Sequence, residues 1–531
     1  MNKLLFSICL LCYLCGLVAQ NSLSALLPMP NRITTVTGQP PFVLTEKTVI
    51  QSDLPESSFC VSELRRILCD RTGFTPALSS LSNDKPGIRL ILDTSMLGNE
   101  HYILSVSDRS ITIKGATSGA ILYGIMTLDQ ILLGNSCQSS SGVVVAIEID
   151  DQPRFGYRSL LLDPARHFLP IEDIKFYIDQ MIRYKYNTLQ LHLTDDQGWR
   201  IQIKKHPGLT QTGNYYTQEE LQVLIQYATE RNVEIIPEID IPGHTVAALS
   251  AYPELGCTHT DTMPKIVGET TNLMLCANNE QVYSFVEDII TEVADLFPSH
   301  YIHLGGDEAV LEQNWTICEH CSQLMKQKGY TKAAQLMNDF FGKIIPMARE
   351  KGKEVSLWCE LDNIRMPAKE YLFDYPQDVI LTTWRDGLTP LCIDLTAQHG
   401  NKLIMAPGEY AYLDYPQYTN DFPEYKNWGM PITTLESVYS FDPGYGLPAE
   451  KQAHIVGVNG TLWGEAITDM NRATYMTYPR GLALAEAGWT QMEHRDWESF
   501  KGRMFPNITE LMKRGVSVRV PFEVIDRKAV H

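Results

Sequence analysis

The stretch Tyr301-Ile302-His303-Leu304-Gly305-Gly306-Asp307-Glu308 carries the strongest indication of fold in this chain of 531 residues. A short apolar run ends in two glycines, and two carboxylates follow directly. Successive side chains of a β-strand point to opposite faces, so Asp307 and Glu308 can share one pocket only where the glycines let the backbone leave the strand. The pattern predicts a buried strand with an acidic pair at its carboxyl end.

Two carboxylates held this close cannot ionise alike, because the charge on one raises the pKa of the other. Glycoside hydrolysis needs such a difference between a general acid and a companion carboxylate. The alternative is an acidic loop without chemistry, and the rest of the chain has to decide between the two.

Short apolar runs alternate with helical segments from Phe155 onward. The eight expected strands are Arg158–Leu162, Thr188–Leu193, Glu234–Ile239, Tyr301–Leu304, Glu354–Trp358, Val379–Trp384, Lys402–Ala406 and Gly457–Trp463. Helices are expected among them at Glu172–Lys185, Gln218–Asn232, Asn279–Phe297, Lys332–Glu350 and Thr389–Gln398. The alternation predicts an α/β fold, a closed (β/α)8 TIM barrel, with its chemistry at the carboxyl ends of the strands. An open doubly wound sheet is the alternative, but no glycine-rich phosphate loop follows any of these strands.

A small α+β domain is expected before the barrel, over residues 20–150, with the barrel spanning 151–531. Its strands are expected at Thr48–Gln51, Ile88–Leu92, Tyr102–Val106 and Ser110–Lys114, followed by a helix at Ser118–Leu133.

Residues 1–19 have the features of an export signal: a positive charge at Lys3, an apolar run from Leu4 to Gly16, and small residues up to Ala19. Export to the periplasm or the exterior is therefore expected. A surface lipoprotein is disfavoured, because Cys12 and Cys15 each follow a leucine rather than a small residue.

The net charge of −19 argues against nucleic acid or an anionic membrane as a partner. Nine cysteines remain after the signal, an odd number that excludes complete disulfide pairing. Cys257 and Cys276 flank a polar loop and could close it. Cys318 and Cys321 have redox or zinc spacing, but with no second Cys/His pair nearby they are interpreted as a local disulfide or free thiols, and no metal or cofactor is expected.

Polar and aromatic residues collect just past the expected strands, as a barrel enzyme requires. Aromatic rings pack on sugar C–H faces while charged groups bind hydroxyls, so this set indicates a sugar site. The residues include Asp195, His244, Asp307, Glu308, Trp358, Trp384, Tyr412, Asp414, Trp463 and Glu465.

A metal-dependent hydrolase is a rival interpretation. His192, His244 and His303 could supply ligands together with Asp195 or Asp307. The histidines stand singly on separate strands, however, which favours hydrogen bonds to acids or sugar hydroxyls.

Several motifs together resemble the β-N-acetylhexosaminidases of glycoside hydrolase family 20. They are HLGGDE at 303–308, GYRSLLLDPARHF at 156–168, HLTDDQGWR at 192–200, PEIDIPGH at 237–244 and WGE at 463–465. The resemblance covers the barrel and the preceding small domain. It implies an exo-acting hydrolase that removes terminal non-reducing N-acetylhexosamine from β-linked oligosaccharides or glycoconjugates, with retention and without a cofactor.

The family's mechanism is substrate-assisted: the 2-acetamido oxygen of the sugar attacks the anomeric carbon and forms an oxazolinium ion. By resemblance, Glu308 is the general acid and base, Asp307 orients the acetamido group, and Tyr412 donates to its oxygen. The resemblance also implies that Arg158, Asp414 and Glu465 bind the ring hydroxyls of the sugar. Trp358, Trp384 and Trp463 are implied to contact the acetamido methyl and the face of the sugar. Asp195 and His244 are implied to adjust the acidity of the Asp307–Glu308 pair.

Two other classes stay open at this point. One is a carbohydrate-binding protein without catalysis, and the other is a two-carboxylate retaining glycosidase acting on a plain hexose.

Overall fold

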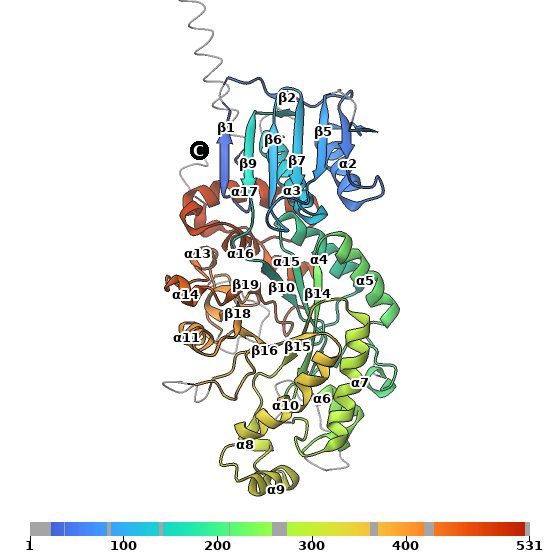
Figure 1. The fold of residues 1–531 in the computed structure, drawn as a ribbon, viewed down its shortest axis with the longest axis vertical. Coiled ribbons are helices and arrows are strands. Elements are labelled where there is room, and N and C mark those ends of the chain that lie inside the picture. Colours follow the sequence, from blue (N-terminus) through green and yellow to red (C-terminus); the bar gives the residue numbers. More distant parts are fainter. Residues whose placement is uncertain are drawn as a thin grey trace, which may run out of the picture.

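The computed structural model describes residues 23–36, 38–81, 86–136, 142–211, 213–257, 273–361, 370–418 and 430–525. Figure 1 shows these residues as an N-terminal sheet domain stacked on one end of a larger α/β unit. The expected export signal lies outside the described residues. Within them, no helix is both long and apolar enough to cross a membrane.

The larger unit is a closed barrel of eight parallel strands, which confirms the predicted TIM barrel. Closure is made by the first and last strands, where Tyr157 pairs with Gly457 and Leu160 with Gly460. The strands in order are β10 (Tyr157–Leu162), β11 (Thr188–His192), β14 (Glu234–Ile241), β15 (Tyr301–Gly305), β16 (Glu354–Trp358), β17 (Ile380–Thr383), β18 (Lys402–Met405) and β19 (Ile455–Gly460). All eight lie where the sequence predicts them, with ends that differ by at most three residues.

The helices around the barrel bury apolar stripes of helical period, as in α7 (Glu280–Leu296), where Val282, Val286, Ile289 and Val293 face inward. A capping box between Thr217 and Glu220 starts α5 (Gln218–Glu230). The long helices are α4 (Ile171–Arg183), α5 (Gln218–Glu230), α7 (Glu280–Leu296), α10 (Ala334–Glu350), α11 (Thr389–His399), α15 (Met470–Thr477), α16 (Arg480–Trp489) and α17 (Trp497–Lys513).

Short elements follow the carboxyl ends of the barrel strands and surround the mouth. They are the ribbon β12 (Thr194–Asp195) and β13 (Gly198–Trp199) and the helices α6 (Val246–Ala251), α8 (Leu311–Asn314), α9 (Glu319–Lys328) and α12 (Gly408–Ala411). Two more short helices lie between β18 and β19: α13 (Leu435–Ser440), which packs on α16, and α14 (Ala449–Gln452), which packs on α11.

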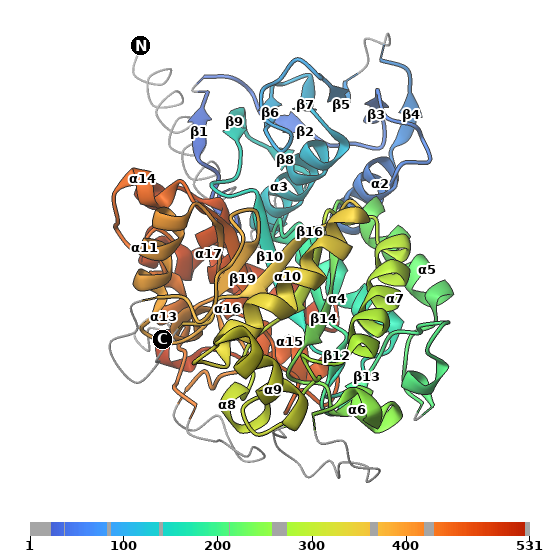
Figure 2. The ribbon, with the colours of Figure 1, turned by 60° about the horizontal axis from the view of Figure 1, so that its bottom comes forward.

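The N-terminal domain has a seven-stranded mixed sheet with two helices on its barrel side (Figure 2). In spatial order the strands are β1 (Arg32–Thr35), β9 (Ile147–Asp151), β6 (Tyr102–Val106), β7 (Ser110–Gly115), β5 (Gly87–Leu92), β3 (Val49–Ser52) and β4 (Ala77–Ser79), with β2 (Phe42–Val43) and β8 (Val143–Val144) paired apart. The helices are α2 (Phe59–Thr72), which the sequence analysis did not predict, and α3 (Ser118–Ser136), which it did. Helix α3 is apolar nearly all round because it packs on the sheet on one side and on α4 of the barrel on the other.

Buried ion pairs join the two domains. Lys185 at the base of the barrel lies 3.1 Å from Asp151, and neither side chain reaches solvent. Asp129 of α3 lies 2.8 Å from Arg71 and 2.9 Å from Arg183. Removing one member of such a pair leaves a buried charge uncompensated, so the pairs tie the orientation of the domains to the fold. The sheet domain therefore covers the amino end of the barrel and leaves the carboxyl end open.

Candidate active site

The acidic pair follows β15, where the backbone turns through two glycines with φ of 64° at Gly305 and 89° at Gly306. A Cβ at position 305 would lie 1.7 Å from Oδ1 of Asp240, so only glycine fits there. Glu308 itself has φ of 46°, a left-handed conformation that non-glycine residues seldom adopt. Such strain persists where the surroundings impose it, and here it accompanies the presentation of a carboxylate at the mouth.

The two acids differ in their surroundings. The Glu308 side chain is 45% exposed and that of Asp307 only 12%. Burial, and then the neighbouring charge of Asp307, raise the pKa of Glu308 above its usual range. Oδ1 of Asp307 is buried and has no hydrogen-bond partner among the described residues. One acid is therefore suited to carry a proton, and the other offers a free acceptor oxygen.

His244 lies between this pair and a second layer of carboxylates. Its Nε2 is 3.8 Å from Asp307 and 3.6 Å from Glu308, while its Nδ1 is 3.3 Å from Asp195. Burial alone would lower the pKa of His244, but Asp195, Asp240 and Asp307 raise it well above its ordinary value. The imidazolium form therefore faces both members of the acidic pair.

Asp240 was not among the site residues predicted from the sequence, although it belongs to a motif quoted there. A bulge in β14 between Glu238 and Ile241 shifts its pairing with β15 and directs Asp240 toward the acidic turn. Oδ1 of Asp240 accepts a hydrogen bond of 3.3 Å from the Gly306 N–H. Burial and the charge of Asp307 raise the pKa of Asp240 well above its usual range.

Glu238 forms a buried layer beneath the mouth. One of its oxygens lies 3.0 Å from Nδ1 of His192, and the other lies 3.2 Å from Nδ1 of His303. It also accepts hydrogen bonds of 2.8 Å from Gln190 and from the indole N–H of Trp358. His303, one of the three histidines weighed above as metal ligands, lies in this layer.

The rival metal hypothesis can be tested against this geometry. Three groups at the mouth bring ligand atoms close enough for an ion: His192 with Glu238 and Asp240, Asp195 and Asp196 with His244, and Asp240 and His244 with Asp307. Both ring nitrogens of His192 already face carboxylates, at 2.8 Å from Asp195 and 3.0 Å from Glu238. Each histidine in these groups thus pairs with acids, and these ion pairs account for the clusters.

Aromatic rings form one wall of the mouth. The rings of Trp358 and Trp463 are 5.5 Å apart, and those of Tyr412 and Trp463 are 6.4 Å apart. Trp384 packs against the same group. Trp358 is almost fully buried, whereas Trp384 and Trp463 are partly exposed. The indole N–H of Trp384 is a buried donor with no partner among the described residues.

Asp414 and Glu465 lie at the same end of the barrel. Burial, and then the charge of Glu465, raise the pKa of Asp414 well above its usual range. The backbone N–H of Trp463 donates to Asp414, yet Oδ1 of Asp414 has no partner among the described residues. This oxygen is a second free, buried polar atom at the mouth.

Arg158 does not belong to the site, contrary to the sequence prediction. It stands at the start of β10, and its guanidinium points to the amino end of the barrel, where it lies 2.7 Å from Glu100 and donates to Tyr123 and to the Lys185 carbonyl. A side chain near the beginning of a barrel strand cannot reach the carboxyl end of the barrel. The structure thus places Arg158 apart from the other predicted site residues.

Arg166, eight residues later and past the end of β10, occupies the mouth. Its guanidinium lies 2.9 Å from Asp163, 2.8 Å from Asp195 and 3.9 Å from Glu465. It also stands over the ring of Trp463, 5.1 Å from the centroid. The rule that chemistry collects after each strand could have found it, because it lies in the Asp163–His167 segment that follows the first strand.

The site therefore gathers ten of the eleven predicted residues around one opening, with Arg166 and Asp240 added. The profile described as "Glycosyl hydrolase family 20, catalytic domain" matches residues 155–492, and that of "Glycosyl hydrolase family 20, domain 2" matches residues 23–152. The chain belongs to glycosyl hydrolase family 20.

Relatives agree with this assignment and with a glycoside hydrolase activity. A β-hexosaminidase of Akkermansia muciniphila is 34% identical over 79% of this chain and 85% of its own length. Among solved structures, a family 20 exo-β-N-acetylglucosaminidase from Vibrio harveyi in complex with N-acetylglucosamine has a TM-score of 0.81 at 31% identity, covering 94% of this chain and 79% of that one. An N-acetyl-β-hexosaminidase from Streptomyces plicatus in complex with Thio-NAglucal has a TM-score of 0.79 at 29% identity, covering 94% and 97%.

Proposed function

We propose that the protein is an exo-acting β-N-acetylhexosaminidase that hydrolyses terminal non-reducing N-acetylglucosamine or N-acetylgalactosamine by a retaining, substrate-assisted mechanism. One observation carries the proposal. Glu308 is a half-exposed acid with a raised pKa. The neighbouring Asp307 is buried, and its Oδ1 has no hydrogen-bond partner among the described residues. An unpaired buried acceptor is costly unless a ligand donor satisfies it.

Glu308 is the general acid. Its raised pKa lets the carboxyl hold its proton to higher pH than an ordinary glutamic acid does, so that it can donate to the glycosidic oxygen as the bond breaks. Once the leaving group departs, the same carboxylate accepts a proton from the water that attacks the anomeric carbon.

The acetamido group of the substrate supplies the nucleophile. Its N–H would donate to Oδ1 of Asp307, which turns the carbonyl oxygen toward the anomeric carbon and stabilises the positive charge that develops on the oxazolinium ion. Tyr412, buried against Trp463, would donate its hydroxyl proton to the acetamido oxygen. Burial raises the pKa of Tyr412 well above its usual range, so that this donor keeps its proton.

The remaining groups hold the sugar. Trp358, Trp384 and Trp463 would enclose the acetamido methyl and one face of the ring. Asp414 and Glu465 would accept from ring hydroxyls, and Arg166 takes the role first given to Arg158. Its planar guanidinium, fixed by Asp163 and Asp195, presents donors in one orientation.

A pair of aryl glycosides tests the proposal. The protein should cleave aryl N-acetyl-β-glucosaminide or its galacto counterpart and leave the aryl β-glucoside intact. Cleavage of both would favour a two-carboxylate glycosidase, and cleavage of none would favour a binding protein. A thiazoline mimic of the oxazolinium ion should inhibit competitively and far more tightly than free N-acetylglucosamine.

We also propose that the protein is exported to the periplasm or the exterior. Lys3, the apolar run from Leu4 to Gly16 and the small residues up to Ala19 support this. N-terminal sequencing of protein recovered from the extracytoplasmic fraction should find Gln20 first, and a retained Met1 in the cytosol would contradict it.

A further inference from the structure

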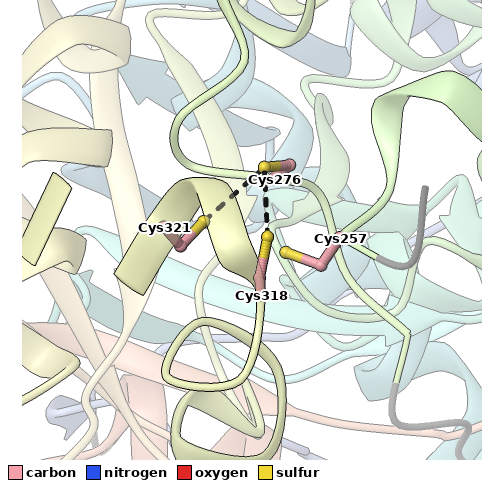
Figure 3. Close-up of side chains that lie close together, drawn as sticks. All are labelled: Cys257, Cys276, Cys318 and Cys321. Atoms are coloured by element: carbon pink, nitrogen blue, oxygen red, sulfur yellow. Dashed lines mark hydrogen bonds between the residues drawn. The ribbon is translucent and has the colours of Figure 1, made fainter. Parts of the chain in front are cut away.

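Four cysteine side chains from two distant segments meet beside the catalytic mouth (Figure 3). Cys257 and Cys276 stand on either side of residues 258–272, which are outside the described part of the chain, while Cys318 and Cys321 lie at the start of α9. Sγ of Cys276 is 3.5 Å from Sγ of Cys321 and 3.9 Å from Sγ of Cys318. All four sulfur atoms lie within 4.8 Å of one another, and all four side chains are buried.

These distances fit a shared metal better than disulfides. A disulfide needs about 2.05 Å between its sulfurs and joins only two of them. Thiolates placed ~2.3 Å from a central Zn2+ at tetrahedral angles stand about 3.8 Å apart. We propose that Cys257, Cys276, Cys318 and Cys321 hold one structural Zn2+ in a closed four-cysteine site. This corrects the sequence interpretation of Cys318 and Cys321, which found no second ligand pair nearby.

Local structure around Cys318 suits thiolate ligands. Cys318 is the N-cap of α9, so its side chain lies at the N-terminus of that helix. The N-terminus of a helix favours negative charge. Asn278 donates a hydrogen bond of 2.8 Å to the His320 carbonyl. This bond joins the segment that carries Cys276 to the segment that carries Cys318 and Cys321.

The site connects the two loops that carry the chemistry. The Leu275 N–H donates to the Pro242 carbonyl at 3.0 Å, two residues before His244. The indole N–H of Trp315, seven residues after Glu308, donates to the Leu275 carbonyl at 3.0 Å. A metal bound to Cys276, Cys318 and their partners would therefore fix the loop after β14 against the loop after β15. Its role is structural, because none of the four cysteines is among the residues assigned to the substrate.

The other described cysteines provide controls. Cys359 and Cys392 form a pair with sulfurs 3.5 Å apart, and neither belongs to a group of metal-ligand geometry within the described residues. Cys69 is exposed on α2. Replacing Cys69 removes a thiol without touching the four-cysteine cluster.

Elemental analysis of the full chain, purified without a polyhistidine tag, tests the proposal. We expect one zinc per chain in the wild type and in Cys69→Ser, and none in the Cys318→Ser/Cys321→Ser double variant. Native mass spectrometry of the wild type should show the mass of one zinc less the displaced protons. Absence of metal after reduction and incubation with Zn2+, or iron as the only bound metal, would overturn the assignment.

A second measurement covers the case in which the double variant does not fold. Titrating wild-type protein with a mercurial thiol reagent should release its zinc in step with the modification of four buried thiols, and the thermal midpoint should fall. Disulfides instead would appear as a loss of two hydrogens for each bond, with no metal released. These readouts do not depend on glycoside hydrolysis, so they stand whatever the activity assays find.

Discussion

Nε2 of His244 lies 3.6 Å from Oε2 of Glu308, so a histidine charge acts directly on the proton of the proposed acid. His244 lowers the pKa of Glu308, while burial and Asp307 raise it further than His244 lowers it. The pKa of the acid is thus a balance of opposing neighbours.

Replacing His244 should move the pH profile in a defined direction. In His244→Gln the imidazolium charge is lost, the pKa of Glu308 rises, and the basic limb of kcat/KM, which reports loss of the acid's proton, should move to higher pH. His494→Gln, on the exposed surface, should leave the profile unchanged. A basic limb that moves to lower pH would contradict the assigned coupling.

Glu308→Gln should lower kcat on natural β-linked oligosaccharides by roughly 10²- to 10⁴-fold, the usual contribution of general acid catalysis. An aryl glycoside with a good leaving group needs little protonation and should lose much less in its bond-breaking step. The surface variant Glu287→Gln is the matched control. Equal losses on both substrates would remove Glu308 from the role of acid.

Asp307→Asn should act through the acetamido group. Without its negative charge the oxazolinium ion loses stabilisation, so kcat/KM should fall by about 10²- to 10³-fold and the thiazoline mimic should bind correspondingly less tightly. Because the charge of Asp307 raises the pKa of Glu308, the basic limb should move to lower pH, opposite to His244→Gln. Unchanged thiazoline affinity would show that Asp307 does not contact this group.

Substitutions of Arg166 and Arg158 should have different effects, the first on KM and the second on the free energy of unfolding. Arg166→Lys should raise KM by at least tenfold, because an ammonium cannot reproduce the guanidinium geometry, with little change in unfolding by urea. Arg158→Met should leave KM of the folded enzyme near that of the wild type but cost roughly 3 kcal/mol of stability, since it removes the cation that pairs with Glu100. The reverse pattern would restore Arg158 to the site.

The strands and the acidic turn were predictable because they depend on local pattern. Each barrel strand is a short apolar run, and Gly305 and Gly306 mark the bend before the acids. Arg158 was misassigned because a motif does not say at which end of the barrel each of its residues lies. The bounds of the strand do show the end at which each residue lies, since Arg158 is near the start of β10 and Arg166 follows its carboxyl end.

The remaining features depend on tertiary contacts. Asp240 points to the acidic turn because of a bulge in β14, which alternation along a strand does not predict. Helix α2 has a weak apolar stripe and is held in place by α3. The cysteine cluster needs Cys276 and Cys318, 42 positions apart, to meet through two loops. No local signal in the sequence specifies that meeting.

The pairing of Arg158 with Glu100 places the N-terminal sheet at the end of the barrel opposite the catalytic mouth. Substrate thus approaches from one pole of the molecule and the N-terminal sheet caps the other. If the enzyme is immobilised through its sheet domain, the opening faces away from the support and a long glycan can present its chain end without meeting the surface. Attachment near α8 or α9 would turn the opening toward the support instead, so the direction of tethering should decide how well the enzyme trims bulky glycoconjugates.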